Sequence, residues 1–114
     1  NAYLLKNIIK KFTKKKIIIK WPNDLLIKKE KICGILQEVV NFNTKNFLII
    51  GVGINTNSFP IIKNYKATSL SFILKRKVNN DIILKAIHKD YEKFIQQIEK
   101  HSFTELKKKY YKNK

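Results

Sequence analysis

The sequence has few of the residues that would place it in several common protein classes. Its 114 residues include one Cys, no Met, three Gly and two Pro. A single Cys excludes an internal disulfide and a zinc site built from several Cys side chains. The apolar runs, such as residues 47–50, are too short to span a bilayer, and no segment has the layout of a signal peptide. We therefore expect a soluble cytoplasmic protein with no membrane partner.

Acidic residues and arginine are also scarce, which leaves a formal net charge of +17. The chain has 25 Lys+Arg against 8 Asp+Glu, and Arg76 is its only arginine. With 19 Ile and 12 Asn beside the lysines, this composition is typical of an A/T-biased genome. Proteins that read phosphates tend to use arginine, and these lysines do not form one stripe. A basic nucleic-acid-binding module stays the alternative of a different class, but we expect no specific nucleic-acid partner.

Hydrophobic periodicity predicts a helix followed by a β-meander in the first half of the chain. Apolar residues recur every three or four positions over residues 2–13, as on one face of a helix. A buried strand is predicted at 17–19, further strands at 25–27 and 32–40, and a central strand at 47–54. The polar segments 28–31 and 41–45 are predicted to be turns.

The second half is predicted to be a loop followed by helices. Residues 56–65 have a loop composition, and 69–75 fit one short helix. A longer helix is expected to begin near Asn80 or Asp81, with one apolar face made by Ile83, Ile87, Tyr91, Phe94 and Ile98. A last helix is predicted at 103–111. The expected fold is one α+β unit, with a mixed or antiparallel sheet packed against helices.

Three short segments carry the residues that fit a binding or catalytic site. Residues 20–24 read KWPND, which fits either a turn or an interrupted strand with polar side chains aimed into a pocket. Lys31 precedes Gly34, a glycine inside a predicted strand, where a ligand or another backbone could need the room. That lysine is otherwise one of 24 solvated lysines. Cys33, beside it, is interpreted as a small buried residue.

The third segment, GVGIN at residues 51–55, is not a nucleotide-binding loop of a familiar kind. A Rossmann motif requires a third glycine, but position 56 is Thr, and the next residues do not open a helix. No Walker A sequence is present. Gly51 and Gly53 therefore serve either tight packing or a bare strand surface for a flat ligand, with Asn55 at its end. His88 and His101 lie away from these segments and are assigned no catalysis.

In combination, the three segments resemble the biotin–protein ligases. That family carries KWPNDL, KxxGILxE and IGxGINxN in the same order and at similar spacing, and this chain has KWPND, KICGILQE and GVGINTN. The resemblance extends to the preceding helix, to ATSL at 67–70 and to the closing helices. It implies the class II synthetase-like catalytic domain. It also implies a ligase that makes biotinyl-5′-AMP from biotin and ATP with Mg²⁺, then biotinylates a lysine of the carboxyl carrier protein of acetyl-CoA carboxylase.

The resemblance also implies a role for individual residues. Lys31 and Asp24 would be catalytic, with Lys31 touching biotin and the adenylate phosphate and Asp24 acting on the incoming amine. The remaining residues would bind the two substrates: Gly34, Ile35, Gly51 and Gly53 for biotin, and Trp21, Asn23 and Asn55 for the nucleotide. A homodimer is compatible with the same resemblance.

The sequence departs from the family pattern at its ends. The GRGRxxRxW segment expected before KWPND and the C-terminal SH3-like domain are missing from residues 1–114, as is a winged-helix DNA-binding domain. We therefore interpret the chain as a partial catalytic domain and expect it to be inactive alone. Lipoate–protein ligases are the nearest alternative, although they match less well at Trp21, Pro22, Ile35 and Leu36. A remnant of a decaying gene is a further alternative, against which the intact motifs argue.

Overall fold

The computed structural model describes residues 1–100, so the predicted helix at 103–111 lies outside the described residues. Four strands form one antiparallel sheet in the order β1 (Ile17–Lys20), β2 (Asp24–Ile27), β3 (Glu30–Phe42) and β4 (Lys45–Ile54). Short turns connect β2 to β3 and β3 to β4, and in both turns two residues have positive φ. Such turns match the right-handed twist of the flanking strands. The predicted meander is confirmed.

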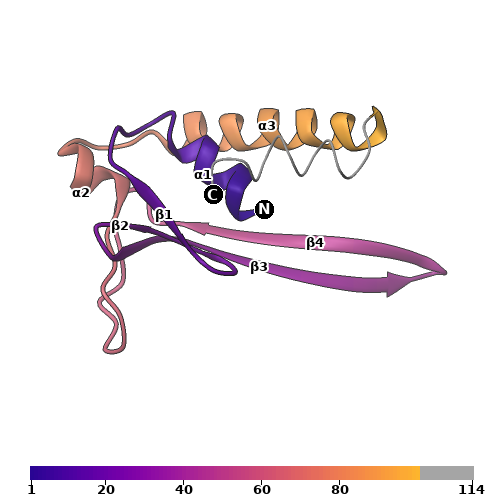
Figure 1. The fold of residues 1–114 in the computed structure, drawn as a ribbon, viewed down its shortest axis with the longest axis horizontal. Coiled ribbons are helices and arrows are strands. Elements are labelled where there is room, and N and C mark those ends of the chain that lie inside the picture. Colours follow the sequence, from indigo (N-terminus) through magenta and orange to yellow (C-terminus); the bar gives the residue numbers. More distant parts are fainter. Residues whose placement is uncertain (101–114) are drawn as a thin grey trace.

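Three helices complete the described part of the chain: α1 (Ala2–Ile9), α2 (Leu70–Leu74) and α3 (Asn80–Lys100). Figure 1 shows α1 and α3 on one side of the sheet, while the loop between β4 and α2 extends on the other side. Ser69 caps α2, because its hydroxyl accepts a hydrogen bond from the backbone N–H of Phe72. None of the helices described is long and apolar enough to cross a membrane.

The core lies between α1, the first three strands and the start of α3. Its fully buried side chains come from α1, β2, β3 and α2 and include Leu5, Ile8, Ile9, Leu25, Ile27, Ile32 and Leu70. Two polar contacts link α3 to residues on either side of α1. Lys11 Nζ lies 2.7 Å from Asp90 Oδ2, and the Tyr91 hydroxyl donates to Asn1 Oδ1 at 3.0 Å. Burial raises the pKa of Tyr91 to about 12, so this hydroxyl keeps its proton at neutral pH.

The prediction of a central strand at 47–54 is wrong, because β4 is an edge strand of the sheet. Phe47, Leu48 and Ile49 are 48–58% exposed, since the β3–β4 hairpin extends beyond the other strands (Figure 1). An unbroken apolar run is typical of a strand that is buried on both faces. An unbroken apolar run reports strand propensity, however, and does not say how many neighbours the strand has.

Two further predictions need correction near the start of the chain. The buried strand at 17–19 is buried only in part, because β1 is the other edge strand and Ile18 is 46% exposed. The helix predicted over 2–13 ends at Ile9 and continues as a turn. Beyond β1 the chain reverses at residues 21–23, so KWPND forms the turn of the β1–β2 hairpin, one of its two interpretations from the sequence.

Candidate active site

The three sequence segments lie side by side because of the strand register. Asp24 of β2 pairs with Gly34 of β3, and Gly34 pairs with Gly53 of β4. Each of these residues comes from a different segment, although Asp24 and Gly53 are far apart in the sequence. The antiparallel pairing therefore places a carboxylate and two glycines in one row across the sheet.

A β-bulge brings Lys31 onto the same face as Gly34. In a regular strand, residues three apart point to opposite faces. Here Leu25 pairs with Cys33 but Leu26 pairs with Lys31, so Ile32 is an extra residue on β3. A bulge of this kind shifts the alternation by one residue. Ile32 and Cys33 are consequently both buried in the core, and the spacing K-x-x-G puts its lysine directly beside its glycine.

The ammonium group of Lys31 is held between a carboxylate and an aromatic ring. Lys31 Nζ lies 3.3 Å from Asp24 Oδ1 and 5.1 Å from the centroid of the Tyr65 ring. A Cβ built on Gly34 would lie 3.2 Å from both Cε and Nζ of Lys31. Gly34 therefore leaves the room in which the lysine side chain crosses the strand. The two charged side chains are 28% and 33% exposed, so a dissolved anion can reach them.

A cavity of about 240 Å³ adjoins this ammonium group. Residues of the sheet and of the loop after β4 line the cavity: Lys31, Cys33, Gly34, Gly53, Ile54, Asn55, Pro60 and Tyr65. A Cβ built on Gly53 would make only an ordinary contact, 3.9 Å from the backbone oxygen of Gly34. The glycine at this position is thus not needed to relieve a clash. It leaves the strand surface bare, as expected for a flat ligand.

Asn55 ties the end of β4 to the segment that follows the loop. Its side-chain amide donates to the backbone oxygen of Thr68 at 3.0 Å and to that of Lys31 at 3.4 Å. Its backbone N–H donates to Ile32 and its carbonyl accepts from Leu70, both at 2.9–3.0 Å. Asn55 therefore fixes the wall of the cavity, and its amide nitrogen is already engaged.

Several residues with a predicted substrate role do not line this cavity. Trp21 is 67% exposed in the turn between β1 and β2. The Ile35 side chain is buried in the core, so only its backbone could meet a ligand, and its N–H donates to the Asn23 carbonyl at 2.9 Å. Gly51 faces the same side of the sheet as Gly53, two residues along the strand. None of these residues belongs to the lining of the cavity.

Sequence reasoning missed two residues that close the cavity, Pro60 and Tyr65. Both lie in the segment that was predicted only as a loop. Nothing in their sequence pattern indicates which way the loop folds, because its position depends on long-range backbone hydrogen bonds.

Cys33 is buried as predicted, and burial raises the pKa of its thiol to about 12, so it stays protonated at neutral pH.

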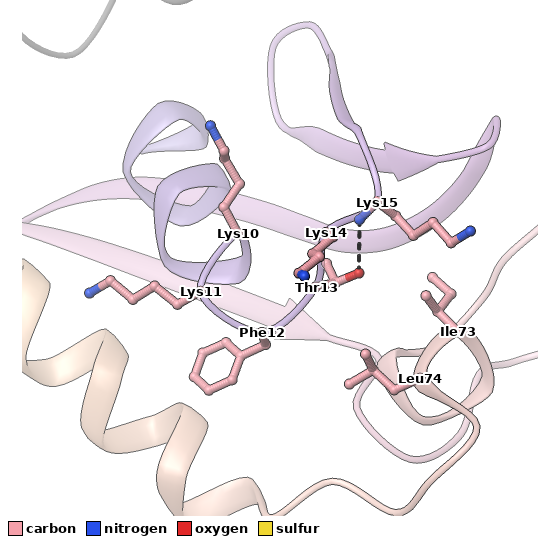
Figure 2. Close-up of a pocket in the computed structure, with 8 residues that line it drawn as sticks. All are labelled: Lys10, Lys11, Phe12, Thr13, Lys14, Lys15, Ile73 and Leu74. Atoms are coloured by element: carbon pink, nitrogen blue, oxygen red, sulfur yellow. Dashed lines mark hydrogen bonds between the residues drawn. The ribbon is translucent and has the colours of Figure 1, made fainter.

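A larger cavity of about 720 Å³ lies elsewhere, between the end of α1 and α2. Figure 2 shows that the side chains of Lys10, Lys11 and Lys15 extend in different directions around it. Thr13 Oγ1 accepts a hydrogen bond from the backbone of Lys15, and Lys11 is paired with Asp90. No residue of the three segments lines this cavity. Its lysines do not converge on one point, and we assign it no function.

The chain is similar to known protein ligases. Residues 2–55 match the model of the Biotin/lipoate A/B protein ligase family. The chain is 37% identical over 94 residues to the Bifunctional ligase/repressor BirA of Bacillus subtilis, a match that covers 78% of this chain and 29% of that protein.

Solved structures of biotin protein ligase from Aquifex aeolicus have the same fold. The apo structure is 28% identical with a TM-score of 0.74, covering 94% of this chain and 48% of that chain. The structure in complex with biotin and ATP is 27% identical, also with a TM-score of 0.74, covering 93% and 45%. The fold is thus the one seen in these biotin protein ligase structures. The chain belongs to the biotin/lipoate A/B protein ligase family, and within it the likeness is to biotin protein ligases.

The chain spans less than half the length of these relatives.

Proposed function

We propose that this chain is part of a biotin–protein ligase and that biotin binds in the cavity beside Lys31. The observation that carries the proposal is the row Asp24–Gly34–Gly53 with Lys31 folded over it. The row offers a bare surface against which the bicyclic ring of biotin can lie, and Lys31 offers a cation for the biotin carboxylate. The likeness to a relative named as a ligase and to a biotin protein ligase solved with biotin and ATP supports the same proposed function.

The proposed first step joins two anions, and Lys31 is the cation placed for it. A biotin carboxylate oxygen attacks the α-phosphorus of ATP. The bond between that phosphorus and the bridging oxygen of the pyrophosphate breaks, giving biotinyl-5′-AMP and pyrophosphate. Repulsion between the carboxylate and the phosphate opposes their approach, and a fixed ammonium group lowers that repulsion. Mg²⁺ would arrive with the ATP phosphates as part of the substrate. The described residues hold no cluster of His, Cys, Asp and Glu able to bind a metal.

The proposed second step uses Asp24. The amine of an acceptor lysine attacks the acyl carbon of the adenylate, the acyl–phosphate bond breaks, and AMP leaves. The amine must lose a proton on the way, and a carboxylate beside the acyl group can orient it and take that proton. Asp24 Oδ1 lies 3.3 Å from Lys31 Nζ. When an anionic substrate engages Lys31, Asp24 loses part of that partner and becomes available to the amine.

The remaining parts of the proposal concern substrate contacts and partners. Gly34, Gly51, Gly53 and the backbone of Ile35 would contact biotin, while Trp21, Asn23 and Asn55 would contact the nucleotide. The acceptor would be a biotin carboxyl carrier protein in the cytoplasm. The exposed apolar edge strand β4 is the surface on which two copies would pair if the ligase is a homodimer. We further propose that the chain forms one part of the catalytic domain and is inactive without the rest.

Ligand titration followed by NMR tests the proposed function without requiring catalysis. With the ¹⁵N-labelled chain, biotin in the millimolar range is expected to shift the amide signals of Gly34, Gly51 and Gly53, because its ring would lie on their surface. Lipoate, whose single ring is smaller and lacks the ureido group, is expected to shift them much less. The amide of Lys45, at the far end of β4, serves as the internal control. Equal shifts with both compounds, or shifts only at Lys45, would contradict the proposal.

A further inference from the structure

We propose that Tyr65 is a positioning residue, whose ring holds the Lys31 ammonium group at the mouth of the cavity. This inference rests on the proposed function for its consequence in binding, but not for the contact itself. Tyr65 lies 34 residues after Lys31 in the loop that sequence analysis left without a role. The Lys31 Nζ lies 5.1 Å from the centroid of its ring, within the range of a cation–π interaction.

Backbone contacts hold the segment that carries Tyr65 beside Lys31. Lys31 N–H donates to the Lys66 carbonyl, and Thr68 N–H donates to the Lys31 carbonyl, both at 2.9 Å. Residues 66–68 thus run alongside Lys31 as a short parallel bridge centred on Ala67. On its other side Tyr65 pairs with Ile62, which closes the end of the loop. The same lysine whose ammonium contacts the ring also anchors, through its backbone, the segment that carries the ring.

Tyr65 can hold the ammonium group without removing its charge. Lys31 has a long side chain with several rotatable bonds, and ordering it opposes binding. Asp24 restrains the same group, but a carboxylate neutralises the charge that an anionic substrate needs. An aromatic ring attracts a cation through its quadrupole and carries no net charge. Tyr65 therefore keeps Lys31 in place at the moment when Asp24 gives way to the substrate.

Two substitutions of Tyr65 distinguish the positioning role from a purely structural one. Tyr65→Leu removes the aromatic face, whereas Tyr65→Phe keeps the face and removes only the hydroxyl. Phe59→Leu is the matched control, because Phe59 lies in the same loop but stacks edge-on against Phe72, with centroids 5.8 Å apart. The first measurement is the ¹H shift of the Lys31 ε-methylene. We expect a ring-current shift in the wild type, in Tyr65→Phe and in Phe59→Leu, and its loss in Tyr65→Leu.

The second measurement is affinity for biotin and for its neutral methyl ester. Tyr65→Leu is expected to bind biotin about twofold to fivefold more weakly, the size of an exposed cation–π contact, and to bind the ester with unchanged affinity. Tyr65→Phe is expected to restore biotin affinity. An equal loss for biotin and the ester, or a Lys31 signal unchanged by Tyr65→Leu, would overturn the positioning role. If the wild type binds no biotin, the proposed function fails, and the Lys31 signal alone decides whether Tyr65 positions Lys31.

Discussion

Replacing Lys31 with Gln is expected to weaken biotin binding by about tenfold to 100-fold. The change shortens the side chain by one atom, keeps a polar end group and removes the charge beside the cavity. A hydrogen bond to a charged group contributes about 1.5–3 kcal/mol, and each 1.4 kcal/mol is about a factor of ten in affinity. The Lys31 side chain is 28% exposed, so solvent screens its charge. This screening lowers the expected loss of affinity toward the tenfold end of the range. The affinity is measured from the shifts of the Gly51 and Gly53 amide signals.

Two controls isolate the charge of Lys31 from the general basicity of the chain. Lys45→Gln removes one positive charge at the far end of β4 and is expected to leave biotin affinity unchanged. Biotin methyl ester lacks the carboxylate and is expected to bind the wild type and Lys31→Gln equally. If Lys45→Gln weakened binding as much as Lys31→Gln, the affinity would come from the net charge of +17 and not from the site.

Replacing Leu25 with Ala is expected to lower the free energy of unfolding by about 3 kcal/mol. Leu25 is fully buried on β2, between Ile19 of β1 and Cys33 of β3, and belongs to the cluster that packs against α1. Truncation of such a side chain costs about 2–5 kcal/mol, since apolar contacts are lost and a cavity remains. Urea unfolding followed by circular dichroism measures the change.

Leu36→Ala provides the matched control for this substitution. Leu36 is 70% exposed on β3, and its removal is expected to change stability by about 0.5 kcal/mol or less. Equal losses of unfolding free energy at Leu25 and Leu36 would contradict the described core. A Leu25→Ala chain as stable as the wild type would contradict it as well. Because Leu25 follows Asp24 directly, a loss of packing at this point is also expected to loosen the site.

The sequence allowed the local parts of the site to be predicted, because they depend on neighbouring residues. The buried Cys33 was predicted from residue type, while the turn at KWPND and the bare strand surface at Gly51 and Gly53 were each one of two interpretations that residue type and spacing allowed. The strands themselves were also predictable from their apolar residues. The predicted roles of these residues toward biotin and ATP came from the family resemblance, and they stay predictions until a ligand is measured.

Non-local parts of the fold could not be predicted in the same way. The edge position of β4 depends on which strands lie beside it, and its apolar run carries no information on that point. The bulge at Ile32 depends on how two strands align, yet it explains why Lys31 and Gly34 can meet at a spacing of three residues. Tyr65 reaches Lys31 only through hydrogen bonds between segments more than thirty residues apart.

Intermolecular nuclear Overhauser effects would show directly whether biotin binds on the sheet beside Lys31. In the ¹⁵N- and ¹³C-labelled chain saturated with biotin, we expect contacts from the bicyclic ring protons to the amides of Gly51 and Gly53. We also expect contacts from the methylene next to the biotin carboxylate to the ε-methylene of Lys31. Contacts that place biotin instead in the cavity lined by Lys10 and Leu74, or on no defined surface, would contradict biotin binding beside Lys31.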